Sequence, residues 1–497
     1  DSDIRTDIAL SINQIVDEAF YFVGSYINIL ACEQGDIEYQ FSSAGRYYPI
    51  ITEHRANRSG SVRTALQRLT VPPTHGMLAH TARRVRTEGR NLKLRFGSKS
   101  RNASVYSSSS NKLLSEWAPT DHVSLRSLVP STGGAFVDAS HPPTATTVSD
   151  LISERFSKVI ADHGFEPDDL TREYVRRIAA KHLELSKQAR KKNYEKYFNT
   201  RNSLLLVATG GNFANRLMSH IFQRNDLPVI RFSHGGERGL MVDHRWHYAE
   251  LVCTDMYVMH GRTEAQQVEE TVVHSKSIIV PQTVKFIAAG SVSHSRLRSA
   301  NTATNPQNRV RNVMVMPTSL RGSIRPAFAS TGEEPVYLEW HLRLLESLRK
   351  SDYNVISKRH PKELYSSTKL FTGYAHEEIT QGMFASLVSK ADAFVFDFAS
   401  SAFMEGLCTN KPVVLVEFPH RPLVPGGREE VAAVCTIIRA EYDENNRMVA
   451  PFDEVITGLS QPVDIQRRQQ FVEDYLLSPS ENLSEFTDLL SRATSSG

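Results

Sequence analysis

Short apolar runs alternate with amphipathic segments through the second half of the chain, and this alternation constrains the fold more than any other feature. A run such as Ser203–Thr209 (SLLLVAT) is short for a helix and ends in the turn residues Gly210 and Gly211. Buried strands separated by helices are typical of a parallel sheet. We therefore predict an α/β protein, with strands at 203–209, 227–233, 255–259, 313–316, 354–357, 393–396 and 412–417.

A polar stretch at 295–311 divides this α/β region into two series and is predicted to be a linker. With 497 residues, the chain is too long for one ordinary core. We expect two Rossmann-like domains joined at the linker. Helices are predicted at 335–350, near 376–390 and over the tail at 463–493.

The N-terminal part of the chain has a different texture. Isoleucine recurs at helical spacing at its start, which predicts a helix over 4–31. Residues 98–111 are Ser-rich and residues 129–147 are rich in Pro, Gly, Ser and Thr, so both are expected to be loops. A second helix, over 168–198, is densely basic, which indicates either a solvated face or contact with an anionic membrane surface or an acidic glycolipid.

Composition narrows the class of protein. A formal charge of +3 is small for this length, so bulk electrostatics does not argue for a nucleic-acid partner. The four cysteines form no CxxC pair, so the sequence suggests neither a zinc site nor a disulfide framework. This cysteine usage fits a protein of the reducing cytoplasm. We find no apolar run of transmembrane length and expect no signal peptide. Because the chain opens at Asp1 and not at Met, we expect it to be part of a larger multidomain chain.

Three groups of polar residues follow predicted strands, at the sheet edge where ligands bind in such folds. The first is Asp397-Phe-Ala-Ser-Ser401, after which a helix begins. Free N–H groups at a helix start and the hydroxyls of Ser400 and Ser401 can bind a phosphate, although either serine can equally serve as a simple helix cap. Glu405, one turn later, is a candidate for a ribose hydroxyl. Thr318 follows the strand at 313–316.

The second group ends the strand at 354–357. Lys358, Arg359 and His360 are three potentially cationic side chains, and Pro361 breaks the strand after them. Such side chains can meet a phosphate, and a polar turn is the alternative interpretation.

The third group, Ser233-His-Gly-Gly-Glu237, follows the strand at 227–233. Gly235 and Gly236 allow a backbone to approach a ligand closely, but the segment lacks the GxGxxG spacing of a dinucleotide site. Downstream histidines and carboxylates could supply an acid, a base or a nucleophile. The candidates for catalysis are His234, Glu237, Asp243, His247 and Glu250. No HExxH or convincing DxD pattern supports a metal site.

Together these motifs resemble the nucleotide-binding half of GT-B glycosyltransferases that use cytidine-activated donors. His360-Pro361 and Ser400-Ser401 are similar to the His-Pro and Ser-Ser motifs shared by bacterial sialyltransferases, polysialyltransferases, capsule Kdo transferases and CDP-glycerol polymerases. The loop at His234 looks more like retaining β-Kdo transferases. The chain lacks the Asp/Glu-Asp/Glu-Gly motif of polysialyltransferases, which favours the Kdo branch. The resemblance covers about 204–460.

The resemblance implies a GT-B fold in which two domains face a cleft. Residues 1–295 would hold the acceptor and the catalytic carboxylate, residues 305–460 would bind the nucleotide, and helices in 461–497 would pack back across the cleft. It further implies that His360 and Pro361, with Ser400 and Ser401, bind the cytidine nucleotide and its phosphate. The other candidates for binding the donor, which the resemblance does not assign, are Lys358, Thr318, Gly235, Gly236 and, for the ribose, Glu405.

The activity expected from this resemblance is transfer of a sugar acid, most simply Kdo, from a CMP-activated donor to a bacterial surface glycan or its lipid-linked precursor. Retention through a carboxylate nucleophile is expected, without a metal or another cofactor, in the cytoplasm or at the periphery of the inner membrane. Two alternatives remain open. One is a CDP-polyol phosphotransferase or a transferase of sialic, legionaminic or pseudaminic acid. The other is a non-catalytic module that binds nucleotide sugars as a scaffold.

Overall fold

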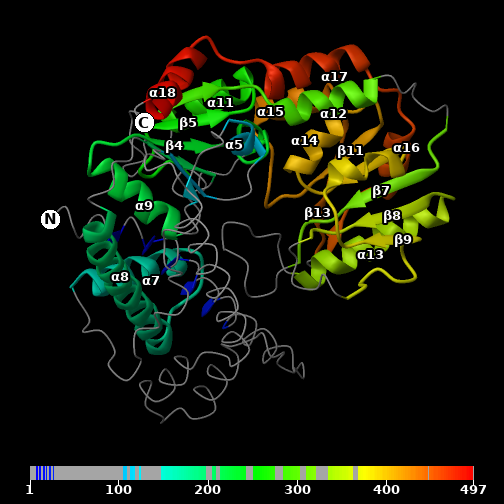
Figure 1. Ribbon diagram of the computed structural model, residues 1–497. Coiled ribbons are helices and arrows are strands. Elements are labelled where there is room, and N and C mark those ends of the chain that lie inside the picture. Colours follow the sequence, from blue (N-terminus) through cyan, green and yellow to red (C-terminus); the bar gives the residue numbers. More distant parts are fainter. Residues whose placement is uncertain are drawn as a thin grey trace.

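The computed structural model describes two parallel α/β units and a helical N-terminal region (Figure 1). Helical positions scattered between residues 7 and 26 are described, in agreement with the helix expected over 4–31. The other described ranges are 105–108, 112–117, 123–124, 147–197, 204–208, 213–241, 250–274, 284–302, 309–320, 334–361, 368–445 and 447–495.

The first sheet has six parallel strands in the order β2-β1-β3-β4-β5-β6. Apolar residues alternate between its two faces. One face is packed under α5 and the C-terminal helix α18, and the other is packed under α11. Burial on both faces is the reason that these strands are almost purely apolar. The strands are β1 (Val105–Ser108), β2 (Val123–Ser124), β3 (Leu204–Val207), β4 (Val229–Phe232), β5 (Met256–Met259) and β6 (Lys285–Ala288), and the helices are α5 (Lys112–Trp117), α9 (Phe213–Gln223), α11 (Arg262–His274) and α18 (Leu483–Ser495). Helix α12 (Val292–Thr302), which follows β6, lies over the second unit (Figure 1).

The second sheet also has six parallel strands, in the order β12-β11-β10-β7-β8-β9. This is the strand order of a Rossmann fold, in which the chain turns back between the first strand, β7, and the fourth, β10. The two faces are covered by α13 and α16 on one side and by α14 and α17 on the other. The strands are β7 (Asn312–Met316), β8 (Asn354–Lys358), β9 (Glu377–Ile379), β10 (Ala393–Phe396), β11 (Val413–Glu417) and β12 (Thr436–Arg439), and the helices are α13 (Glu334–Lys350), α14 (Ser401–Leu407), α15 (Pro425–Ala432), α16 (Phe452–Leu459) and α17 (Ile465–Val472).

Smaller elements complete the description. Helices α7 (Thr147–Asp162) and α8 (Asp169–Tyr197) pack together below the first sheet (Figure 1), and residues from the N-terminal helix fill the core beside α8. A two-stranded ribbon pairs β13 (Glu441–Tyr442) with β14 (Met448–Val449). The short turns are η2 (Arg238–Leu240), η5 (Phe384–Ser386) and η6 (Val388–Lys390), and a π-helical turn, η7 (Glu473–Leu477), follows α17.

The predicted fold class is confirmed by the two parallel sheets, and a strand lies at every apolar run predicted to form one. Two Rossmann-like units in contact with each other form the GT-B arrangement. The tail crosses from the second unit back to the first, where Phe486 of α18 packs edge-on against Trp117 and Phe232. Within the described ranges, no helix is long and apolar enough to cross a membrane.

Three local predictions were wrong. The segment 376–390, expected to be a helix, forms the edge strand β9 and two short turns, because Glu377–Ile379 pairs with β8 and Gly382 takes a φ of +84°. Residues 295–302 of the expected linker 295–311 belong to α12, whose start is capped by Glu116. Within 98–111, expected to be a loop, Val105–Ser108 forms a strand beside β3. The described part of 129–147 is the first residue of α7, and the rest lies outside the described residues.

Candidate functional site

Strands β7, β8 and β10 are neighbours in the second sheet, and their carboxyl ends carry the predicted nucleotide-binding residues. Met316 is paired with Phe396, and Val315 is paired with Ser357, so the three strands end at one level. The loops that follow therefore lie side by side. Ligands bind parallel sheets where the strand order reverses, which here is between β7 and β10.

Thr318, after β7, is held by the side chain of Asp397, after β10. Its N–H donates to Oδ2 of Asp397 at 2.9 Å, and its hydroxyl donates to Oδ1 at 3.0 Å. Two residues of α13 complete the network. The hydroxyl of Tyr337 donates to Oδ2, and Nε2 of His341 lies 3.1 Å from the same oxygen. The carboxylate thus ties together the two strand ends that flank the reversal point.

Burial perturbs both titratable members of this network. Desolvation raises the pKa of Asp397 from 3.8 to about 6, while the hydrogen bonds from Thr318 act to lower it. Desolvation also lowers the pKa of His341 from 6.5 to about 3, because a buried imidazole resists becoming charged. His341 was not among the residues predicted from sequence. The only signal for it was a histidine on a helix face whose other residues are apolar or aromatic.

Of the four residues from the end of β8 onward, two face the interior and two lie nearer the surface. Lys358 and Arg359 are buried, at 2% and 1% exposure. Nζ of Lys358 donates to the carbonyl oxygen of Arg359, and the Arg359 guanidinium pairs with Glu378 at 2.7 Å. His360 is exposed and Pro361 is partly exposed. The geometry therefore presents His360 to a ligand more directly than Lys358.

Ser400 and Ser401 begin α14 and are both partly exposed. Ser400 is the N-cap, and its hydroxyl accepts a long bond of 3.4 Å from the N–H of Phe403. Ser401, the first helical residue, carries its side chain toward the first unit. Glu405 is buried, at 5% exposure, one turn further along. The capping role considered for these serines thus falls on Ser400.

The loop after β4 carries the predicted catalytic residues. His234 is exposed, whereas Gly235, Gly236 and Glu237 are buried. Oε2 of Glu237 is buried without a hydrogen-bond partner among the described residues, and Oε1 lies 3.9 Å from Nε of Arg238. A buried carboxylate oxygen without a donor is unusual, because its desolvation is costly. It is the type of group that a substrate or an acceptor hydroxyl can satisfy.

The remaining candidates from sequence are placed differently. Asp243 and His247 lie outside the described residues. Glu250 is buried, and its carbonyl oxygen accepts hydrogen bonds from the guanidinium of Arg231 and the hydroxyl of Thr254, both at 2.9 Å. Although the side chain of His234 reaches the surface, the protein packed around it desolvates the imidazole and lowers its pKa, while the charges of Glu237 and Glu250 act to raise it.

The two predicted half-sites meet at Gly235 and Ser401. A Cβ placed on Gly235 would lie 2.3 Å from Oε2 of Glu237 and 2.4 Å from Cβ of Ser401, so these two side chains are close neighbours across the domain boundary. The same loop continues the contact further on. The carbonyl oxygen of Leu240 accepts a bond of 2.9 Å from the N–H of Val424. Gly235 is therefore required by space, since any side chain there would separate the two half-sites.

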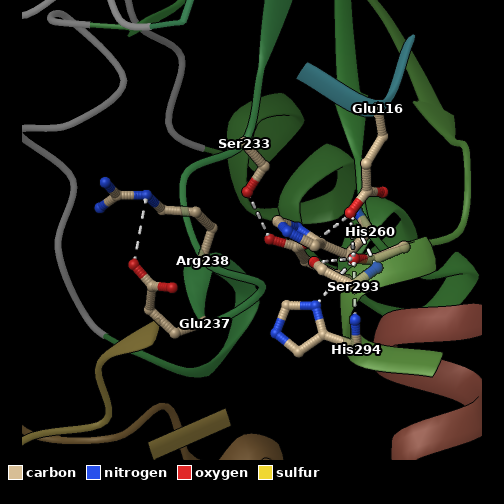
Figure 2. A network of polar contacts seen from close by, with 9 residues as sticks. Glu116, Ser233, Glu237, Arg238, His260, Ser293 and His294 are labelled. Carbon is tan, nitrogen blue, oxygen red and sulfur yellow. Dashed lines mark hydrogen bonds and ion pairs between the residues drawn. The ribbon is translucent and has the colours of Figure 1, made fainter. Parts of the chain in front are cut away.

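A polar network lies behind this loop, as Figure 2 shows, and it was not predicted from sequence. Glu264, on the first turn of α11, accepts from the hydroxyl of Ser233 at 2.7 Å and from the N–H of His260 at 2.8 Å. The rings of His260 and His294 meet edge to face at 5.3 Å. The partners of Glu264 are up to 31 positions away along the chain, and no local pattern indicates such a contact.

Within the described ranges, no three His, Cys, Asp or Glu side chains gather closely enough to hold a metal ion. The groups suited to an anionic ligand are the side chains of Thr318, His360 and Ser401 at the carboxyl edge of the second sheet. Opposite them, His234 and Glu237 offer a titratable ring and a carboxylate.

No protein-family model and no curated protein matches the chain. Among solved structures it is similar to UDP-N-acetylglucosamine 2-epimerase from Rickettsia bellii, with 14% identity, coverage of 75% of this chain and 91% of that one, and a TM-score of 0.40. It is also similar to the glycotransferase of kitacinnamycin (13%, 76% and 95%, 0.35) and to Arabidopsis thaliana UGT89C1 complexed with UDP-L-rhamnose (11%, 78% and 89%, 0.38). At these values the GT-B assignment rests on the two parallel sheets, their strand orders and the contact between their carboxyl edges.

Proposed function

We propose that the protein is a glycosyltransferase that takes a sugar acid, Kdo in the simplest case, from a CMP-activated donor. The observation that carries the proposal is the meeting of Glu237 with Ser401, which brings a buried carboxylate beside the residues expected to hold the donor phosphate. The cytidine nucleotide and the sugar identity rest on the resemblance of the His-Pro and Ser-Ser motifs. The acceptor is a bacterial surface glycan or its lipid-linked precursor.

In this proposal the phosphate lies against His360 and Ser401, and hydrogen bonds from these residues stabilise CMP as it leaves. Glu237 attacks the anomeric carbon while the bond from that carbon to the phosphate oxygen breaks, and the electron pair departs with CMP. The acceptor hydroxyl then attacks the glycosyl–enzyme ester, its proton passes to a base, and the Glu237 carboxylate is regenerated. His234 is the base nearest along the chain. Two displacements at one carbon retain its configuration.

Nucleotide binding is tested by calorimetry with CMP, CDP, UMP and CDP-glycerol. Loss of a hydrogen bond to a charged group costs about 1.5–3 kcal/mol, so His360→Ala and Ser401→Ala should each weaken CMP binding by about 10–150-fold. His163→Ala and Ser460→Ala are matched controls, because both side chains are exposed and lie outside this edge. Unchanged CMP affinity in both site variants would move the nucleotide elsewhere, and binding of CDP-glycerol alone would favour a polyol phosphotransferase.

Transfer is tested with CMP-Kdo and with CMP-activated sialic, legionaminic and pseudaminic acids. Glu237→Gln keeps the shape of the side chain and should abolish transfer while CMP affinity is preserved. Glu429→Gln, an exposed carboxylate on α15, is the matched control. Mass spectrometry of wild-type protein quenched with donor should find the sugar attached to the peptide that contains Glu237. Full activity of Glu237→Gln would remove this residue from the mechanism, and the absence of turnover with every donor would favour a scaffold.

A further inference from the structure

Buried polar side chains lie along the carboxyl edge of the first sheet, and the proposed function gives them no role (Figure 2). Glu264 joins two strand ends there. One of its oxygens accepts from the hydroxyl of Ser233, directly after β4, and the other accepts from the N–H of His260, directly after β5. Its side chain is fully buried. A buried carboxylate is costly unless it is well paired, so its presence calls for a positional reason.

His260 supports the loop after β4 from beneath. A Cβ placed on Gly236 would lie 2.4 Å from Cδ2 of Leu476 and 3.6 Å from Cγ of the imidazole, so the loop at Gly236 lies close to both side chains. Gly236 has a φ of +86°, a conformation that favours glycine and lets the loop turn over the ring. Nδ1 of His260 lies 3.3 Å from Oε2 of Glu264. Glu264 therefore contacts the residue before the loop and the side chain below it.

The network continues to the end of β6. Nδ1 of His294 lies 2.8 Å from the hydroxyl of Ser291, and the His294 ring meets His260 edge-on. Glu116 of α5 accepts from the N–H groups of Val292 and Ser293, at 2.9 and 2.8 Å. Three neighbouring strand ends are thus fixed against one another, and the loop with Glu237 is supported by a rigid base.

We propose that Glu264 is a positioning residue for this loop: by holding Ser233 and His260, it keeps the Glu237 carboxylate beside Ser401. A residue that only held the start of α11 would need its bond to the N–H of His260 alone, which lies one residue before Gly261, the N-cap that a capping-box glutamate would reach. The bond to Ser233 is the additional contact, and it reaches the residue directly before His234. The catalytic consequence rests on the proposed function, whereas the anchoring of the loop does not.

Ser233→Ala separates the two roles, because it removes the bond to the loop and leaves the cap of α11 in place. Loss of a hydrogen bond to a charged group costs about 1.5–3 kcal/mol, so local opening should rise by about 10–150-fold. Hydrogen exchange of peptides over 233–241 should therefore become faster by this factor in Ser233→Ala and in Glu264→Gln. In both variants kcat for transfer should fall, while CMP affinity and KM for the donor should be unchanged. Glu269→Gln, exposed on the same helix, is the matched control.

Exchange over 233–241 and kcat that both equal those of the wild type in Ser233→Ala would overturn the proposal. A lower unfolding midpoint with unchanged kcat would also overturn it, since that is the result of a purely structural role. If wild-type protein turns over no CMP donor, the proposed function fails, and the exchange experiment alone decides whether Glu264 anchors the loop. If Glu264→Gln does not fold, Ser233→Ala carries the test.

Discussion

Asp397 and His341 form a buried pair with opposite pKa shifts. In the wild-type protein, their effects on the pH dependence of the free energy of unfolding should cancel. Below its folded pKa of about 6, Asp397 holds a proton that the unfolded chain releases above 3.8. The free energy of unfolding therefore falls as pH rises through this window, by about 1.4 kcal/mol per pH unit. His341, with a folded pKa of about 3, stays neutral where the unfolded chain binds a proton below 6.5. Its contribution to the free energy of unfolding rises with pH at the same slope.

Between 3.8 and about 6 the two contributions cancel in the wild type, because the neutral pair in the folded protein holds as many protons as the charged pair in the unfolded chain. In His341→Gln the contribution of His341 is removed, so the pH dependence due to Asp397 should become measurable. Relative to the wild type, its free energy of unfolding should fall by about 3 kcal/mol from pH 4 to pH 6. Asp397→Asn should expose the opposite slope, so that this variant loses stability as pH falls from 6.5.

The assay is urea unfolding at a series of pH values, followed by the fluorescence of tryptophan. Trp340 is fully buried beside His341, with ring centroids 4.8 Å apart, so its emission reports on this core. Each variant is compared with the wild type at the same pH, which removes the contributions of all other titrating groups. Difference profiles that are flat for both variants, or that slope in the same direction, would refute the assignment of a neutral buried pair.

Three further predictions concern a close contact at Gly235, the ion pair of Glu378 and the hydrogen bond of Tyr475. Gly235→Ala should reduce transfer and increase the radius of gyration in X-ray scattering, because its Cβ would collide with Ser401; Gly426→Ala, which has nothing within 4 Å of its Cβ, should do neither. Glu378→Gln should lower the free energy of unfolding by about 3 kcal/mol in urea denaturation, since it removes the carboxylate from a buried ion pair with Arg359, and a loss below about 1 kcal/mol would contradict this. Tyr475→Phe should speed hydrogen exchange in η7 by removing the bond to Glu430, and equal exchange would mean that this bond does not hold the tail.

The buried strands could be predicted from sequence because burial on both faces leaves an unbroken apolar run. Val413–Glu417, for example, is buried at every position. The edge strand Glu377–Ile379 could not be predicted in this way, because it is polar and its pairing with β8 is the only feature that makes it a strand. Helix α12 was hidden for a similar reason, since the contacts of Glu116 and Glu473 that stabilise it come from elsewhere in the chain.

The loops that form the candidate site could be predicted from sequence, but the buried side chains that hold these loops in place could not. The loop at His234 and the pair Ser400-Ser401 follow strands directly, so their position at a sheet edge could be inferred from the apolar runs before them. Glu264 and His341 lie within helices and act through side chains that reach other elements. His341 approaches Asp397 across 56 positions of sequence, and nothing local distinguishes it from a buried structural histidine.

The route of the chain between the two units limits how they can move. In the part of the chain that the structure describes, it leaves the first unit after β6, enters the second unit at α12 (Figure 1), and returns through η7 to α18. Gly261 and Gly290 leave no room at this return, because a Cβ on Gly261 would lie 2.2 Å from the backbone of Tyr475, and one on Gly290 would lie 2.7 Å from the carbonyl oxygen of Leu477. Two bodies tied at two places can turn easily only about the line through both ties. Separation of Gly235 from Ser401 would then be a rotation of one unit relative to the other about that axis. Cutting the chain after Val472 would remove one of the two connections and with it the restriction to a single axis.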